Sequence, residues 1–315
     1  MKKEPEARAS ATTDDRFHLD LPERPIIHWS RPIVALLVLL LVVFVVLLFW
    51  RAKINYASVP KYFMAPLMLE GVWNAIKLAL LAQTLAIVVG SILAVMRLSK
   101  NAVNRHIASL YVWFWRAVPV LVSLLIWFNL ALVLQRIQIP DPFSGGYLID
   151  LNTNDVLTPF VAALIALTLN ESAYMAEIIR AGILGVDSGQ IEAARALGMN
   201  DRTILRRATL PQATRLIIPP TSNELINMIK ETSLVSVISY IEITEAANRL
   251  SAANLDIIPA LFAAVVWYLI LVTIATFFQR WVEDRVSHSN SRPRGGRRLF
   301  RTLLGSWNPL TLAKR

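Results

Sequence analysis

The chain contains no cysteine, and both histidine and charged residues are scarce. The lack of cysteine excludes disulfides and thiolate metal sites. The four histidines lie in the terminal regions or in one short loop, and no H-E-x-x-H, G-x-G-x-x-G or G-x-x-x-x-G-K-[ST] motif occurs. We therefore find no nucleophile, metal set or acid–base pair suited to an enzyme, and no nucleotide site. Any ATP chemistry that serves this chain must come from another subunit.

Apolar sequence is abundant. Hydrophobic residues make up 55% of the 315 residues and charged residues 17%, a composition typical of a membrane protein. Six apolar segments are candidate membrane-spanning helices, at residues 33–50, 72–96, 108–135, 157–179, 216–240 and 257–278. The first has 18 residues without a charge, which at about 1.5 Å per residue just spans the hydrocarbon core. The sequence predicts an all-α integral membrane protein with six spans.

The net charge of +10 is explained by where the basic residues lie. One set of loops and tails holds 24 Lys and Arg residues, at 1–32, 97–107, 180–215 and 279–315. The opposite loops, at 51–71, 136–156 and 241–256, hold 5, and the other three basic residues lie within spans. Basic residues are enriched on the cytoplasmic side, so this asymmetry places both termini in the cytoplasm. The charge therefore indicates topology and contact with anionic lipid, not nucleic acid.

A short charged stretch, residues 189–212, separates the fourth and fifth apolar segments. Asp187 is placed to cap a helix, with Gln190 three residues on as in a capping box, and Gly198 suits a left-handed C-terminal cap. Asp201 can cap a second helix that ends by Pro211. Both helices are shorter than the roughly 12 residues that an isolated helix needs in water. The pair must lean either on the rest of this chain, as a generic amphipathic loop would, or on a partner.

The run Glu192-Ala193-Ala194, followed by Gly198 and by Leu210-Pro211, resembles the "EAA" loop of permease subunits of ATP-binding cassette importers. The flanking Gly189-Gln190 and Gln212-Ala213 resemble the polar amino acid subfamily. The stretches AYMAEIIR at 173–180 and KETSL at 230–234 are also similar to that subfamily. The resemblance covers about residues 70–282 and rests on several motifs in the same order.

This resemblance implies that a coupling helix in the loop docks into a groove of an ATPase subunit. The coupling residues that it indicates are Gln190, Glu192, Ala193, Ala194, Gly198 and Pro211. It implies no cofactor in this chain, because ATP and Mg²⁺ would be bound by the ATPase. It also implies a second permease subunit, identical or different, and an external solute-binding protein, all serving a multi-pass protein of a bacterial inner membrane.

The family core generally has five spans, so the resemblance makes residues 33–50 an N-terminal addition to a five-helix type I importer core. We interpret these residues as a retained helix and not a signal peptide, because a long tail precedes them and no small-residue cleavage site follows. The expected organisation is a cytoplasmic tail at 1–32, the extra helix at 33–50, a permease domain at 70–282 with the coupling loop at 185–215, and a basic cytoplasmic tail at 283–315. The outer loop at 139–155 is expected to be a turn-rich connector.

Charged side chains within spans are unfavourable by roughly 2.5–3.5 kcal/mol each and so require a reason. Lys77 lies near an outer end, where its ammonium can reach the interface. Arg116 shortly precedes Pro119, which is expected to bend the span. The sequence Arg116-Ala117-Val118-Pro119 is similar to the family's Arg-Gly-Thr-Pro element but lacks its glycine and hydroxyl. Arg116 either belongs to that element or pairs with a lipid phosphate at the inner face.

A second polar group of residues lies in the fourth and fifth apolar segments. Its members are Asn170, Glu171, Asn227, Lys230 and Glu231. Glu171 can be expected to pair with Lys230 across the bundle interior. Two interpretations stay open. With Arg116, these groups form a hydrophilic path or gate for a zwitterionic solute, or else they are a structural interhelical ion pair.

The function indicated is that of the transmembrane subunit of an ATP-driven importer of polar or charged L-amino acids, which works by alternating access. The alternative is an ion-coupled secondary carrier that uses the second polar group as a proton or sodium relay. The inverted repeats common in such carriers are not visible in the sequence, and a carrier of that kind does not account for residues 189–212.

Overall fold

The computed structural model describes residues 30–52, 54–142 and 145–287. The expected tail at 1–32 lies outside the described residues apart from its last three, and the expected tail at 283–315 lies outside them beyond Ser287. The chain divides into two units, residues 1–54 and 55–315. In the first unit, helix α1 (Ser30–Arg51) contains the apolar stretch expected to span the membrane, and the described side chains of this helix are exposed.

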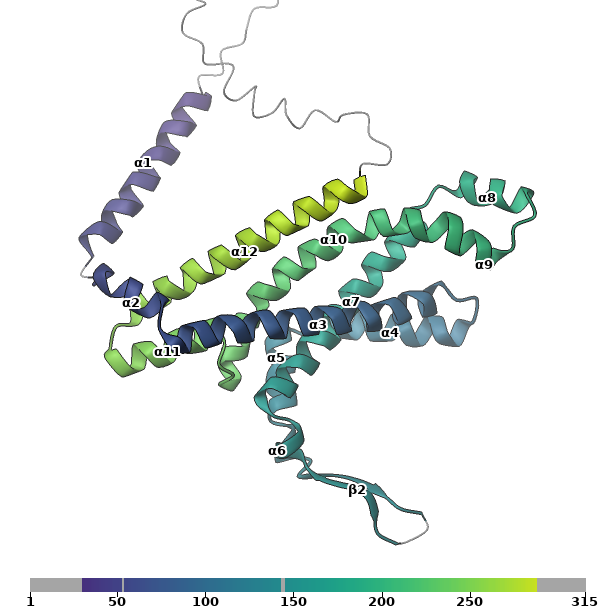
Figure 1. Cartoon of the computed structure of the whole chain (residues 1–315), viewed down its shortest axis with the longest axis horizontal. Coiled ribbons are helices and arrows are strands. Elements are labelled where there is room, and N and C mark those ends of the chain that lie inside the picture. The colour runs from purple at the N-terminus through teal and green to yellow at the C-terminus, as the bar shows by residue number, and fades with distance from the viewer. Residues whose placement is uncertain (1–29, 53, 143–144, 288–315) are drawn as a thin grey trace, which may run out of the picture. The chain divides into compact units, whose positions relative to one another are not determined.

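The second unit is built mainly from four long helices (Figure 1). These are α3 (Pro66–Leu98), α7 (Pro159–Leu184), α10 (Leu210–Glu231) and α12 (Ile257–Ser287). Helices α3 and α7 share the most extensive contact, and α10 packs against α3, α7 and α12. Two short helices, η1 (Tyr56–Ser58) and α2 (Val59–Phe63), lead into α3, and α11 (Ile243–Asn254) packs on both α3 and α12.

Small residues allow α3 and α7 to approach closely. A row of them follows one face of α3 at spacings of three and four, namely Ala75, Ala79, Ala82, Ala86 and Gly90, and all are buried. A Cβ added at Gly90 would lie 2.6 Å from the Cβ of Met175 and 3.0 Å from the backbone nitrogen of Ala176. Close backbone approach through small residues is the usual way for helices to associate within a membrane.

The third apolar segment forms two helices rather than one. Helix α4 (Ala102–Ala117) and helix α5 (Val120–Phe128) meet at an angle of 97°. Pro119 stands at the break, and the preceding Val118 is extended, with φ −81° and ψ 123°. A residue before proline avoids the helical region, so the bend expected at Pro119 is confirmed.

The loop expected to be a connector contains a β-hairpin. After η2 (Leu130–Leu132), strand β1 (Arg136–Pro140) pairs antiparallel with β2 (Tyr147–Asn152), and α6 (Thr153–Val156) then leads into α7. The ion pair between Arg136 and Asp150, with 2.7 Å between Nε and Oδ1, joins the strands. The expectation of an all-helical chain was therefore wrong here, because segments of five and six residues on either side of a short turn are long enough to pair as strands.

Four described helices are long and apolar enough to cross a membrane, or five if the bent pair α4–α5 counts as one span. The four are α1, α3, α7 and α12. The expected fifth apolar segment, 216–240, is divided between α10 and the 3-10 helix η4 (Thr232–Ile238). The chain is thus a mostly helical membrane protein, and its polar α10 is the helix that composition alone marks least clearly.

Candidate functional site

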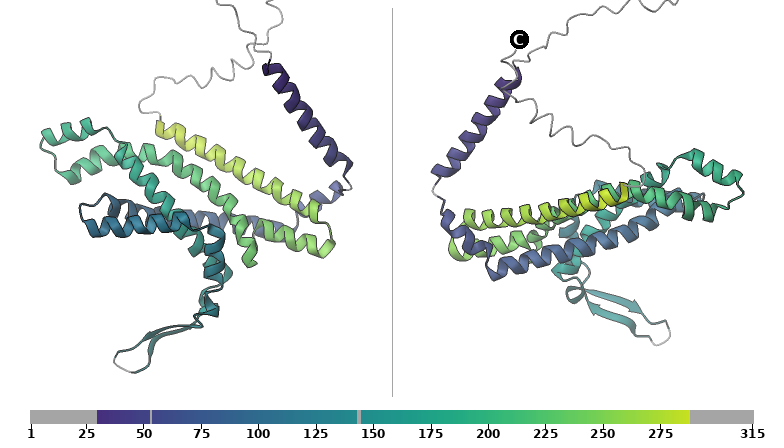
Figure 2. Two further views of the ribbon diagram at one scale, coloured as in Figure 1. Left: turned by 180° about the vertical axis from the view of Figure 1, so that it is seen from behind. Right: turned by 45° about the horizontal axis from the view of Figure 1, so that its top comes forward.

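The charged stretch between α7 and α10 projects from one end of the second unit (Figures 1 and 2). Its first helix, α8 (Ser188–Ala196), begins where Asp187 Oδ1 accepts a hydrogen bond of 2.7 Å from the Gly189 amide. The expected cap at Asp187 is therefore confirmed. The capping box is not formed, because the Gln190 side chain instead accepts a 2.5 Å hydrogen bond from Gln212 on α10.

Helix α8 ends at a left-handed glycine. Gly198 has φ +76°, its amide bonds to the Arg195 carbonyl at 2.9 Å, and the Met199 amide bonds to the Ala194 carbonyl at 3.2 Å. This is the hydrogen-bond pattern of a Schellman cap, so the C-terminal cap expected at Gly198 is confirmed. The conformation favours glycine because a Cβ disfavours positive φ.

Much of α8 is uncovered by the described chain. Gln190, Glu192, Ala193 and Gly198 are exposed and Leu197 is 81% exposed, whereas Ala194 is 8% exposed. Of the expected coupling residues on α8, Ala194 is thus the one that is buried against the rest of the chain, and the others are exposed. A short helix with exposed alanines and an exposed leucine is suited to contact another protein.

The second helix differs from the expectation in two ways. Asn200, and not Asp201, caps α9 (Asp201–Ile204), because its Oδ1 accepts from the Thr203 amide at 2.9 Å. The helix also does not end by Pro211. It continues through the π-helical turn η3 (Leu205–Thr209) into α10, where Pro211 stands in the first turn. Proline is tolerated there because its missing N–H lies where the hydrogen-bond pattern changes from π-helical to α-helical.

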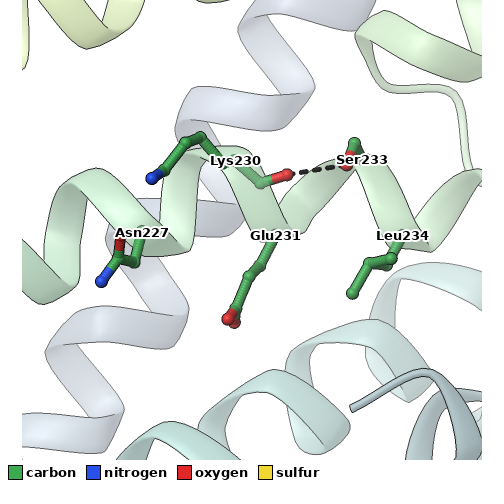
Figure 3. A pocket seen from close by; sticks show the side chains of 5 residues that line it. All are labelled: Asn227, Lys230, Glu231, Ser233 and Leu234. Carbon is green, nitrogen blue, oxygen red and sulfur yellow. Dashed lines mark hydrogen bonds between the residues drawn. The ribbon is translucent and has the colours of Figure 1, made fainter. Parts of the chain in front are cut away.

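A groove of about 290 Å³ lies where α10 passes into η4 (Figure 3). Five residues line it: Asn227, Lys230, Glu231, Ser233 and Leu234. The Ser233 hydroxyl donates to the Lys230 carbonyl at 2.7 Å, and the side chains of Lys230 and Glu231 leave the helix in different directions. Lys230 and Glu231, the last two residues of α10, both line this groove.

Two further acidic residues, Glu224 and Glu171, lie near Glu231 of this groove. Glu224, Asn227 and Glu231 follow one side of α10 at spacings of three and four, and the Asn227 amide lies 3.4 Å from Glu224 Oε2. The carboxylates of Glu224 and Glu231 act electrostatically on Glu171 of α7. Glu171 is 4% exposed, and its Oε1 has no hydrogen-bond partner within the described part of the chain. Glu231 is therefore the acidic side chain that the groove presents to a cationic group.

The ion pair expected between Glu171 and Lys230 is not present in the described part of the structure, where neither side chain has an oppositely charged partner within 4 Å. The reason is the helical repeat of α10. Glu224 and Glu231, on one side of α10, are the residues that act on Glu171, and Lys230 precedes Glu231 by about 100° around the helix. Lys230 is instead exposed.

Asn170 and Arg116 lie away from the groove at α10. The Asn170 amide donates to the carbonyls of Trp115, at 2.7 Å, and Val118, at 3.2 Å, so it holds the break between α4 and α5. Arg116 is 3.9 Å from Glu177 of α7 and lies over the ring of Tyr174. The residues proposed from the sequence are therefore divided into the groove, the helix break and a separate arginine cluster.

Sequence reasoning overlooked two buried or half-buried acids. Glu177 forms ion pairs with Arg97 and Arg180. Its position within a predicted span was a sufficient signal that this charge has a specific role. Glu242 is fully buried and caps α11, accepting from the amides of Thr244 and Glu245 at 2.8 Å each and from the Tyr268 hydroxyl at 2.7 Å. No sequence pattern distinguished Glu242 from an ordinary loop residue.

Burial raises the pKa of Glu242 from 4.5 to about 7. The folded protein then keeps this proton up to about pH 7, whereas the unfolded chain loses it near 4.5, so stability falls as pH rises between these values. A shift of this size corresponds to about 3 kcal/mol. We expect the melting temperature of the wild type to fall, relative to Glu242→Gln, between pH 5 and pH 8. Parallel melting curves for the two proteins over that range would contradict this expectation.

The family described as "Binding-protein-dependent transport system inner membrane component" matches residues 86–288 of the chain. The arginine transport system permease protein ArgU of Corynebacterium glutamicum is 37% identical over 278 residues, covering 88% of this chain and 86% of that protein. The L-cystine transport system permease protein TcyB of Bacillus subtilis is 36% identical over 222 residues, covering 70% and 87%.

Two solved structures are similar to the chain. The crystal structure of an amino acid ABC transporter with histidines has a TM-score of 0.64 at 32% identity, covering 74% of this chain and 100% of its own. An inward-facing structure of the MetNI methionine ABC transporter has a TM-score of 0.56 at 20% identity, covering 71% and 98%. The second likeness concerns the fold alone.

Proposed function

Because this chain belongs to the family of binding-protein-dependent transport system inner membrane components, and is therefore the permease subunit of an ATP-binding cassette importer, we propose that it carries polar or charged L-amino acids inward by alternating access. It is a multi-pass inner-membrane protein, and the ATPase of such a system is a separate subunit. A binding-protein-dependent system also implies an external binding protein as a partner.

The observation that carries the substrate proposal is the groove at α10. It combines an ammonium, on Lys230, with a carboxylate, on Glu231, and these are complementary to the carboxylate and ammonium of a zwitterionic amino acid. The printed names of ArgU and TcyB give arginine and L-cystine as solutes of those relatives. Both are amino acids with polar groups, which supports the same class of solute for this chain.

We propose six spans with both termini in the cytoplasm: α1 as an added helix, followed by a five-helix type I core at 70–282. Two observations support this topology. The arginine-containing segments at the end of α3 and at α8–α9 lie at the same end of the second unit, and α2 and α11 lie at the other (Figure 1). In addition, α10 packs against three long helices, and its Asn227 and Glu231 side chains are half-buried. We also propose that residues 1–32 and 283–315 are cytoplasmic tails.

The coupling loop, residues 185–215, is proposed to dock on the ATPase through α8. The exposed surface of Gln190, Glu192, Ala193 and Gly198 supports this role, while the buried Ala194 and the helix through Pro211 connect α8 rigidly to α10. When two ATPase subunits close on ATP, the docked α8 helices would be drawn together, and α10 would carry that movement to the groove. The driving force is the difference in contact free energy between the two states.

A second permease chain, identical or different, is proposed to complete the path, since the groove at α10 is open in a single chain. The same docking argument requires one coupling helix for each of two ATPase subunits. Anionic lipid is a further proposed partner, through basic residues on the cytoplasmic side, and nucleic acid is not.

The test is uptake of labelled glutamate, glutamine, arginine and histidine by cells that hold this chain with its partners. We expect uptake to survive a protonophore when ATP is maintained and to disappear when ATP is depleted. Uptake that collapses with the proton gradient while ATP is held constant would instead indicate an ion-coupled secondary carrier, and the docking proposal would have to be withdrawn.

A further inference from the structure

A cluster of three arginines surrounds one glutamate where α3, α4 and α7 meet. Arg97 donates to Glu177 Oε1, and Arg180 donates to Glu177 Oε2 at 2.9 Å, so both carboxylate oxygens are occupied. Arg116 lies 3.9 Å from Oε1, which is too long for a hydrogen bond. With three cations and one anion, the cluster carries two uncompensated positive charges.

Arg116 is the cation available to a ligand. Its side chain is 47% exposed, and its guanidinium lies 5.2 Å from the centre of the Tyr174 ring, which holds the group in place through a cation–π contact. Apart from this contact and the weak approach to Glu177, the described residues give Arg116 no side-chain partner. A planar guanidinium held in this way can bind a phosphate through two parallel N–H donors.

Arg97 and Arg116 border a groove of about 450 Å³. Its lining also includes the Ser109 hydroxyl and the indole of Trp113, which is 67% exposed. Tryptophan is enriched at membrane interfaces, where its ring lies at the level of the headgroups. The groove thus has the donors that a phosphate requires and an aromatic side chain suited to the interface.

Helix α4, which lines this groove, also carries a row of exposed apolar side chains. Val103, Ile107, Leu110 and Phe114 recur at spacings of four, three and four, and each is at least 47% exposed. The row is not covered by the described part of the chain. Helix α3, with 33 residues, is about 50 Å long and so exceeds the roughly 30 Å hydrocarbon core, which brings its Arg97 end to the headgroup level.

We propose that this groove binds the phosphate of an anionic phospholipid from the cytoplasmic leaflet, with acyl chains along the apolar row of α4. The assignment to that leaflet rests on the proposed topology. A lipid is favoured over a free phosphate because α4 contributes both to the cationic groove and to an exposed apolar row. Arg116 supplies the principal donor, and Arg97 and Arg180 supply charge while they remain bonded to Glu177.

The test uses the complete purified transporter after delipidation, titrated in detergent with phosphatidylglycerol or phosphatidylcholine and followed by native mass spectrometry. Arg116→Gln should weaken phosphatidylglycerol binding by about tenfold or more and leave phosphatidylcholine binding unchanged. The matched control is Arg105→Gln, which removes an exposed arginine of α4 that does not line the groove. We expect that control to weaken binding by less than about threefold.

Three results would overturn the lipid site: unchanged phosphatidylglycerol binding by Arg116→Gln, an equal loss in Arg105→Gln, or displacement of the lipid by millimolar inorganic phosphate. This last result would mean that the arginines bind a free anion and not a lipid. Uptake by the same proteins is measured separately. A wild type that binds the lipid through Arg116 yet shows no ATP-driven uptake would overturn the proposed function and leave the lipid site standing.

Discussion

Replacing Gly198 with arginine is expected to abolish ATP-driven uptake while the protein still inserts and assembles in the membrane. A non-glycine residue at φ +76° is strained by about 1–2 kcal/mol, which α8 can tolerate because its cap is exposed. A Cβ at this position would meet no atom within 4 Å, so the chain itself leaves room for the new side chain. The arginine would instead occupy the surface that we assign to the ATPase.

The matched control is Gly145→Arg. Gly145 also has a positive φ, +70°, and its Cβ would also meet no atom within 4 Å, but it lies between the strands of the β-hairpin and not at α8. The two variants therefore introduce the same charge and similar backbone strain at different sites. Gly198→Ala serves as a second comparison, because it introduces the strain without the bulk.

The measurements are uptake and ATP hydrolysis by the reconstituted transporter, together with its melting temperature. We expect Gly198→Arg to lose uptake, Gly198→Ala to keep much of it, and Gly145→Arg to match the wild type. Normal coupled transport by Gly198→Arg would refute the docking role of α8. If Gly145→Arg also loses uptake, the effect is due to backbone strain or added charge in general and is not specific to α8.

The ends of α8 could be predicted because they depend on local chemistry. An aspartate before the helix and a glycine after it satisfy the terminal amides and carbonyls directly, and the structure has both. The bend at Pro119 is local in the same way. By contrast, the choice of Asn200 over Asp201 as the next cap is a one-residue difference between two good capping residues, which the sequence alone does not resolve.

The remaining differences arise from tertiary context. Pro211 ends a helix in isolation, yet a π-helical turn just before it allows the chain to stay helical and join α8–α9 to α10. The partner of Glu171 was misassigned because adjacent residues of a helix point about 100° apart, and only packing determines which of them faces α7. Glu177 and Arg97 are 80 residues apart in the chain, so the sequence alone could not predict that they pair.

The groove at α10 leads to the second large expected effect. Lys230→Met should lower kcat/KM for every amino acid transported by about tenfold or more, because the lost ammonium is placed to bind the carboxylate that all amino acids share. Removing a charged partner from a hydrogen-bonded site is unfavourable by about 1.5–3 kcal/mol, and tenfold corresponds to about 1.4 kcal/mol. Lys77→Met is the matched control, since Lys77 lies over the Phe160 ring and not on the groove.

Glu231→Gln tests the opposite charge. Glu231 is the acidic residue that lines the groove, so neutralising it should lower uptake of arginine more than uptake of glutamine, while thermal stability changes little. A greater loss for the cationic solute would mean that Glu231 acts on the side chain of the substrate. Equal losses would mean that Glu231 acts only on the ammonium group that both solutes share. If Lys230→Met and Glu231→Gln both transport normally, or if Lys77→Met is impaired as severely, then the groove is not on the path and its charges serve only to hold α10 in place.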